Sequence, residues 1–352
     1  MKKRFGVVLF VIIVLAGAWT AWQIYSPFRG HAGSVILTIP PGARAPETAA
    51  ILASRGVIRR RLPFLFRYWL GRRRHETIKS GEYQFSRAMS ASSVYEKLVR
   101  GEVYLHTVVI PEGSDRMDCA RILDQDIGLS PAAFMQATSS PAAIRDLDPL
   151  APSLEGYLFP DTYRFPRGVA VASVVGVMLA RFREVLNSDF GSEIRSGPGR
   201  LHDVITLASL VEKETPSAQE RPMIAGVFTR RLAIGMPLQC DPTVAYAIRL
   251  RAGTADPADP FKGPLTHADL ETPSPYNTYL HRGLPPGPIC NPGAASIRAA
   301  LHPAPGTALY FVSNNHGGHV FADTLSEQNR NVARYRKEMN AERSAQPAAA
   351  GR

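Results

Sequence analysis

The segment from Val204 to Pro216 holds the side chains whose types and spacing are best suited to chemistry. Its apolar residues recur at i, i+3 and i+7, which is the pattern of one helix face; they are Val204, Leu207 and Val211. Glu214 continues this stripe three residues later. Because Pro216 disfavours helical geometry at the residue before it, Glu214 is expected in the last turn of the helix.

A carboxyl in that position is suited to general acid catalysis. Unpaired carbonyls at a helix end and apolar surroundings both raise a carboxyl pKa, so Glu214 is expected to stay protonated near neutrality. Such an acid can protonate a glycosidic leaving oxygen. Glu212 lies about 160° around the helix and has Lys213 as a possible partner. From the spacing alone, a solvated Glu214, or one paired with Arg221 or Arg230, is the favoured interpretation.

Two further carboxylates are candidates for the same site. Asp241 precedes Pro242 and a helical pattern, so its favoured interpretation is a helix N-cap with proline at the first helical position. Glu155 precedes Gly156 in a loop. It either lines a cleft or fixes a turn, and the sequence leaves both interpretations open.

The segment Tyr276–Tyr279 combines aromatic faces with an amide, which suits the binding of N-acetylated sugar rings. Packing of this tyrosine-rich loop on the core is the equal alternative. The residues predicted to bind substrate are Glu155, Asp241, Thr243, Tyr276, Asn277 and Tyr279.

No metal or cofactor is expected. His316 and His319 flank two glycines, with no HExxH helix and no evident third ligand. The sequence contains neither a GxxxxGK[ST] phosphate loop nor a GxSxG elbow. His319 is instead predicted to support a hairpin.

The N-terminus predicts a single-pass membrane anchor. Residues 1–4, of which 2–4 are basic, are predicted to form a short cytoplasmic tail. An uncharged run follows, and its residues 5–25 are long enough for a transmembrane helix. A signal peptide cleaved after residues 16–18 is the alternative. It is less favoured because Trp19 and Trp22 continue the run as an interfacial belt would. Both interpretations place the body of the chain outside the cytoplasm, in the periplasm.

Composition describes an ordinary folded chain with an excess of positive charge. Its 352 residues are 45% hydrophobic, and 41 basic against 30 acidic residues leave a net charge of +11. This charge predicts an anionic partner, and outside the cytoplasm that partner is wall or lipid rather than nucleic acid. Cys119, Cys240 and Cys290 are too scattered for a disulfide scaffold, although a bridge between the last two remains open.

Two folded units are predicted after a linker at residues 26–34. Residues 35–110 form a small module with strands at 35–39, 81–85 and 103–110 and helices at 45–54, 62–70 and 92–99. Residues 111–341 form a larger helix-rich unit with helices at 116–124, 131–136, 171–187, 201–214, 221–233 and 294–301 and a hairpin at 309–313 and 319–322. Residues 342–352 are predicted to be a disordered tail. The expected fold class is α+β.

Several blocks of this sequence together resemble the endolytic murein transglycosylases of the MltG/YceG type. They are Ala208–Thr215 (ASLVEKET), Glu220-Arg221, Leu238–Thr243 (LQCDPT), Glu271–Tyr279 (ETPSPYNTY), Gly283–Ile289 (GLPPGPI) with Asn291–Gly293 (NPG), and upstream Glu155–Asp161 (EGYLFPD). The resemblance covers nearly the whole chain. Cys240 departs from the threonine or serine associated with its position, which puts one local contact in doubt.

The resemblance implies a membrane-anchored enzyme of the inner membrane that cuts nascent peptidoglycan strands internally and leaves a 1,6-anhydro-N-acetylmuramic end. It implies that Glu214 is catalytic, that residues 35–110 are a LysM-like module and 111–341 the catalytic domain, and that wall synthases and the elongation or division machinery are partners. Two alternatives stay open: a water-using muramidase with Asp241 or Glu155 as second carboxylate, and a non-catalytic wall-binding scaffold.

Overall fold

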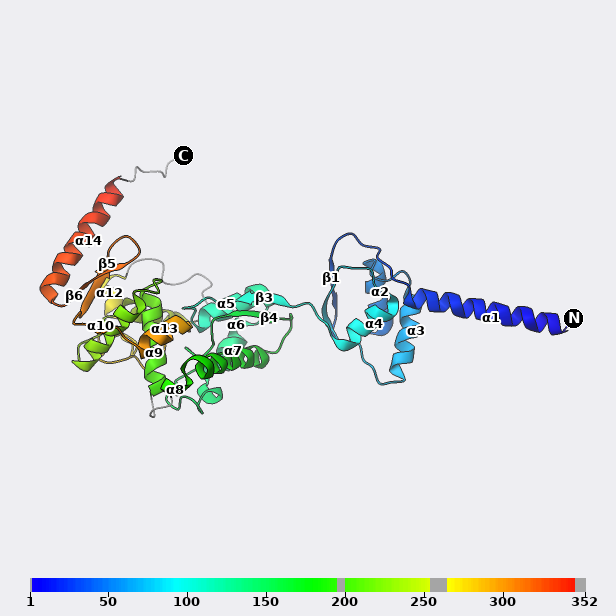
Figure 1. Ribbon diagram of the computed structural model, residues 1–352, viewed down its shortest axis with the longest axis horizontal. Helices are drawn as coiled ribbons and strands as arrows, with labels where there is room; N and C mark the ends of the chain where they lie inside the picture. Colours follow the sequence, from blue (N-terminus) through cyan, green and yellow to red (C-terminus); the bar gives the residue numbers. More distant parts are fainter. Residues whose placement is uncertain (1, 195–199, 254–264, 346–352) are drawn as a thin grey trace. The chain divides into compact units, whose positions relative to one another are not determined.

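The computed structural model describes residues 2–194, 200–253 and 265–345, with the side chains of 2–6, 9, 192 and 342–345 excepted (Figure 1). The chain divides into two compact units. Unit 1 comprises Met1–Thr107 and Arg164–Gly168, and unit 2 comprises Val108–Tyr163 and Val169–Arg352. Both mix helices with two-stranded sheets, as the predicted α+β class requires.

Unit 1 is a small sheet covered by short helices. Its elements are α1 (Lys2–Tyr25), β1 (Val35–Ile39), α2 (Ala45–Ser54), α3 (Arg61–Arg72), β2 (Gly81–Phe85) and α4 (Ala91–Arg100). Strands β1 and β2 are antiparallel, with Val35 opposite Phe85. Alternate residues of both strands, such as Ile39 and Tyr83, face a core completed by α2, α3 and α4. The hydroxyl of Ser90 caps α4 by accepting a hydrogen bond from the N–H of Ser93 (3.1 Å).

Helix α1 exposes most of its apolar side chains. Val7, Val8, Phe10 and Leu15, for example, are each 57–67% exposed. The helix predicted over residues 5–25 is present as part of α1. A transmembrane span is not supported, since among the described residues no helix combines the length and the apolar character needed to cross a bilayer.

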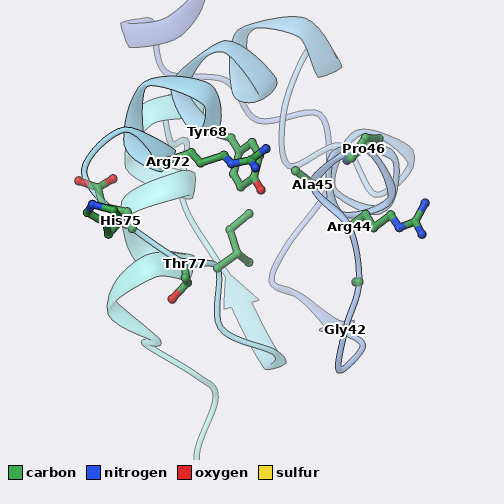
Figure 2. Close-up of a pocket in the computed structure, with 11 residues that line it drawn as sticks. Gly42, Arg44, Ala45, Pro46, Tyr68, Arg72, His75 and Thr77 are labelled. Atoms are coloured by element: carbon green, nitrogen blue, oxygen red, sulfur yellow. The ribbon is translucent and has the colours of Figure 1, made fainter.

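Unit 1 also contains an open groove of about 900 Å³. Figure 2 shows the turn at Gly42 and the start of α2, from Arg44 to Pro46, on one side of it. On the other side lie Tyr68 and Arg72 of α3 and the segment His75–Ile78 that leads to β2. The groove is thus framed by one loop after β1 and one loop before β2.

Unit 2 is mainly helical. Its elements before the central helix are α5 (Arg116–Ile127), α6 (Pro131–Ser139), a 3₁₀ turn (Pro141–Ala143), α7 (Val171–Val185), a π turn (Leu186–Phe190) and α8 (Gly191–Ile194). The later elements are α9 (Arg200–Glu214), α10 (Arg221–Ala233), α11 (Asp241–Ala252), α12 (His267–Leu270), α13 (Ala294–Leu301), β5 (Tyr310–Ser313), β6 (His319–Ala322) and α14 (Leu325–Ala345). Strands β5 and β6 form the predicted antiparallel hairpin, with Ser313 opposite His319.

Helix α9 lies at the centre of unit 2, where α10, α11 and α13 pack against it (Figure 1). From Leu201 to Val211 all its side chains except Asp203 are buried. The single apolar stripe predicted from the sequence was therefore incomplete, because helices cover α9 on several sides. An element buried all round has no solvent face to reveal in its sequence pattern.

Other predictions need correction. Strand β3 (His106–Val109) is shorter than the predicted 103–110, and it pairs with β4 (Thr162–Phe165), which was expected to be loop. Helix α14 was not predicted, and it continues through residues 342–345 of the expected disordered tail, while 346–352 lie outside the described residues. All three cysteines are free and buried, so Cys240 and Cys290 form no bridge.

Candidate active site

Glu214 is the last residue of α9 and its side chain is half-buried. Burial raises the pKa of its carboxyl to about 7, and the charge of Asp241 adds to this rise. A hydrogen bond with the Cys240 thiol acts in the opposite direction, as do His319 and Arg231. Among the described residues, no cation lies within ion-pairing distance of Glu214. A reachable carboxyl that exchanges its proton near neutrality is what general acid and base catalysis requires.

Glu212, two residues earlier, has a different environment. One of its oxygens lies 3.0 Å from Nη2 of Arg221, and the other accepts a hydrogen bond from the N–H of Gly293 (3.0 Å). Its side chain is only 5% exposed. Lys213, the expected partner, instead donates to the carbonyl of Gly113. Glu212 therefore ties the end of α9 to α10 and to the loop before α13, and Arg221 pairs with Glu212 rather than with Glu214.

Glu155 is buried beneath the start of α5. Its carboxyl accepts hydrogen bonds from the N–H of Arg116 (3.1 and 3.2 Å) and from the hydroxyl of Tyr246 (3.0 Å). Burial, then the charge of Asp115, raises the pKa of Glu155 to about 8. Since the residue is 1% exposed, its contacts favour the turn-fixing interpretation over the cleft-lining one.

Asp241 is exposed to solvent. It is the first residue of α11, whose N-cap is Cys240, so the N-cap prediction for Asp241 was wrong. Its carboxylate instead accepts a hydrogen bond from the hydroxyl of Tyr279 (2.5 Å). The charge of Asp241 acts on Glu214, and the charges of both carboxyls act on Tyr279, so these three predicted residues lie near one another.

Asn277 and Thr243 are fully buried and hold the loop in place. The amide nitrogen of Asn277 donates to the carbonyls of Leu270 and Thr272 (both 2.9 Å), and its oxygen accepts from the N–H of Tyr279 (2.9 Å). The hydroxyl of Thr243 donates to the carbonyl of Cys240 (2.6 Å). Both side chains are engaged in bonds that hold the loop with Tyr279 beside α11, and their role in substrate binding stays a prediction.

Tyr276 lies on the side of Glu155 rather than beside Glu214. Its half-buried ring meets the edge of Tyr246 with centroids 5.1 Å apart. Burial, together with the charge of Glu155, raises the pKa of Tyr276 to about 12. These contacts match the alternative in which this part of the loop packs on the core.

Glu220 lies at the centre of a hydrogen-bond network that was not predicted from the sequence. Glu220 accepts hydrogen bonds from the hydroxyl of Thr215 (3.2 Å) and the N–H of His319 (2.8 Å), and its Oε2 lies 2.7 Å from Nδ1 of His319. Thr215 directly follows Glu214 in the chain. The pair of Glu220 and His319 therefore fixes the turn that carries the candidate acid. The Glu220-Arg221 motif was the available signal, but its partner His319 lies 99 positions away.

In the described part of the chain, no group of three or more histidine, cysteine or acidic side chains could hold a metal ion. His319 is engaged with Glu220.

Comparison with known proteins identifies the class. The model of the YceG-like family matches residues 37–334. An endolytic murein transglycosylase of Bacillus subtilis is 31% identical over 86% of this chain and 85% of its own length. One from Streptococcus pneumoniae strain D39 is 30% identical over 86% of this chain but only 58% of its own length. A crystal structure of a YceG-like protein from Listeria monocytogenes has a TM-score of 0.56 at 32% identity, covering 85% of this chain and 99% of that one.

The enzyme class expected from the sequence, a lytic transglycosylase, is thus confirmed by the curated relatives. The chain belongs to the YceG-like family.

Proposed function

We propose that this chain cleaves peptidoglycan glycan strands internally, at the bond between N-acetylmuramic acid and N-acetylglucosamine, and that Glu214 is its single general acid and base. The observation that carries the proposal is the state of Glu214. Its carboxyl is half-buried at a helix end and has a pKa of about 7. The residues directly before and after it in the chain make hydrogen bonds elsewhere. The names of the curated relatives support the substrate.

One carboxyl suffices for this reaction. Protonated Glu214 transfers its proton to the glycosidic oxygen as the bond from that oxygen to C1 of the muramic ring breaks. The resulting carboxylate takes the proton of the C6 hydroxyl of the same ring while O6 bonds to C1. The products are a free 4-hydroxyl and a 1,6-anhydro ring, and Glu214 regains its proton without consuming water.

A water-using muramidase is the second candidate, and the exposed carboxylate of Asp241 is the observation that favours it. Such an enzyme needs a second carboxylate, at a separation that depends on the stereochemical outcome, to act as nucleophile or base. Asp241 is the accessible one, since Glu155 and Glu212 are buried in other contacts.

Mass spectrometry of glycan products separates the candidates. The full chain is incubated with purified glycan strands, and new ends are expected to be lighter by one water than reducing ends. Glu214→Gln is expected to yield no product, whereas Asp241→Asn is expected to keep forming anhydro ends. Reducing ends that disappear in Asp241→Asn would instead support the muramidase, and strands left intact by the unmodified chain would support a scaffold without catalysis.

Unit 1 is proposed to hold the glycan for unit 2, as a LysM-like module would. The groove between Arg44 and Tyr68 is open and offers an aromatic ring beside polar groups. Binding of labelled glycan strands to the full chain carrying Glu214→Gln is expected to weaken when Tyr68 is replaced by alanine. Unchanged binding would remove the groove from the proposal.

Attachment to the inner membrane, with unit 2 in the periplasm, is likewise a proposal. It rests on the uncharged run that follows residues 2–4 and on the exposed apolar side chains of α1. A role in ending strand elongation beside wall synthases would follow from that location. Cell fractionation tests the attachment: the chain is expected with membranes after washing in high salt and at alkaline pH, and release into the wash would contradict attachment through α1.

A further inference from the structure

Helix α3 carries an apolar stripe that the folded unit does not cover. Leu62, Phe66 and Trp69 recur at i, i+4 and i+7 and are 77%, 45% and 48% exposed, and Leu70 beside them is 38% exposed. The opposite side of the helix, with Phe64, is buried in the core of unit 1. These four exposed residues are called the α3 outer face.

Arginines bracket this face at both ends. Residues 59–61 precede the stripe and 72–74 follow it, and all six are arginine. No acidic residue occurs between Glu47 and Glu76. The guanidinium of Arg73 lies over the ring of Trp69, 3.9 Å from its centroid. The α3 outer face is therefore apolar and aromatic, and it is flanked at both ends by strongly cationic segments.

The same chemistry continues onto the last turns of α1. Arg59 lies over Trp22 at 5.2 Å and Arg60 over Trp19 at 5.8 Å, and both tryptophans are more than half exposed. Within unit 1, helices α1 and α3 pack against each other. One continuous surface of exposed apolar groups, tryptophans and arginines thus joins the two helices.

We infer that the α3 outer face lies in the interface of a bilayer rich in anionic phospholipids. Tryptophan, leucine and phenylalanine enter the boundary between headgroups and acyl chains, while arginines at the same depth pair with lipid phosphates. The exposed leucines distinguish this face from a glycan site, because sugars offer no acyl phase in which to bury them. This contact with lipid is made by α3 itself and does not require α1 to cross the bilayer.

A fluorescent probe at residue 66 tests this in the full chain. The native cysteines Cys119, Cys240 and Cys290 are buried, so an environment-sensitive dye is directed to a new thiol in Phe66→Cys. The matched control is Ile36→Cys on β1 of the same unit, because Ile36 is 42% exposed. With vesicles of phosphatidylglycerol and phosphatidylcholine, we expect a several-fold rise and a blue shift of emission at residue 66 and neither at residue 36.

The dependence on lipid charge completes the test. The rise at residue 66 is expected to shrink in phosphatidylcholine alone, in high salt, and when residues 72–74 are changed to glutamine. Emission at residue 66 that stays at its value in water, although the chain co-sediments with vesicles, would overturn the inference while leaving attachment through α1 intact. A response to soluble glycan fragments in place of vesicles would also overturn it. Thermal unfolding of both labelled variants without vesicles reports whether they fold.

Discussion

Two carboxyls of unit 2, Glu155 and Glu214, share a raised pKa but differ in access. Glu155 reaches about 8 and Glu214 about 7, in both cases mainly through burial. Glu155 is 1% exposed and receives hydrogen bonds from Arg116 and Tyr246. Glu214 is half-buried at the end of α9, and besides burial its pKa responds to the Cys240 thiol and to the charged groups around it.

The difference shows that a shifted pKa identifies an acid but does not make it catalytic. Structural groups in buried networks are shifted as strongly as functional ones. Glu214 differs from Glu155 in being half-exposed, and it lies next to a turn held by the Glu220 and His319 pair. Replacing each carboxyl separately tests this difference.

The largest effect is expected for Glu214→Gln. Removing a general acid and base typically costs about 10²- to 10⁴-fold in rate, so glycan cleavage should fall by that amount while thermal unfolding stays close to that of the unmodified chain. Glu155→Gln at pH 6 is the matched control, because glutamine resembles the protonated carboxyl present there. Steady-state release of new glycan ends measures both, and equal losses in the two variants would erase the distinction between them.

Glu212→Gln is expected to affect stability rather than chemistry. It replaces the carboxylate 3.0 Å from the buried guanidinium of Arg221 by a neutral amide, and leaving a buried charge uncompensated in this way costs about 3–5 kcal/mol. Glu112, 3.6 Å from Arg221, remains as a weaker partner. Denaturant unfolding measures the loss, with exposed Glu271→Gln expected within about 0.5 kcal/mol of the unmodified chain. Unchanged stability in Glu212→Gln would mean that this pair does not secure the end of α9.

Glu155→Gln should change how stability depends on pH. A pKa raised from 4.5 to about 8 means that the folded chain keeps this proton to higher pH than the unfolded chain does. The carboxyl therefore lowers stability progressively as pH rises from about 4.5 to about 8, and the penalty is constant above that range. The variant lacks the penalty, so its stability relative to the unmodified chain should increase between pH 5 and pH 9. Parallel curves from thermal unfolding at several pH values would contradict the raised pKa.

The sequence predicted the elements of both units well where the signal is local. Strands β1 and β2 and helices α2, α10 and α13 have the predicted bounds. Strand β4 was missed although Thr162–Phe165 alternates exposed and buried residues, because four residues are too few to stand out from a loop. The single stripe read on α9 described only one of the sides on which helices pack.

The candidate acid was predictable, but the partners around it were not. Glu214 followed from its place before Pro216 and from the motif that resembles the family. Thr243 and Asn277 look like binding residues in the sequence, yet both are buried, and Thr243 bonds to Thr278, 35 positions away. Such pairings depend on how distant segments meet, which no local pattern contains.

The smallest effect is expected for Asp241→Asn, and it tests the electrostatics of the comparison directly. Activity of the unmodified chain should fall as pH rises through about 7, since the reaction begins with protonated Glu214. The charge of Asp241 raises that pKa, so its removal should move the falling limb of kcat/KM to lower pH by a fraction of a unit. Tyr279→Phe is the control, because it removes the hydrogen bond to Asp241 but keeps the charge. A limb that stays in place in Asp241→Asn would mean that burial alone sets the pKa of Glu214, and the two carboxyls would then differ only in access.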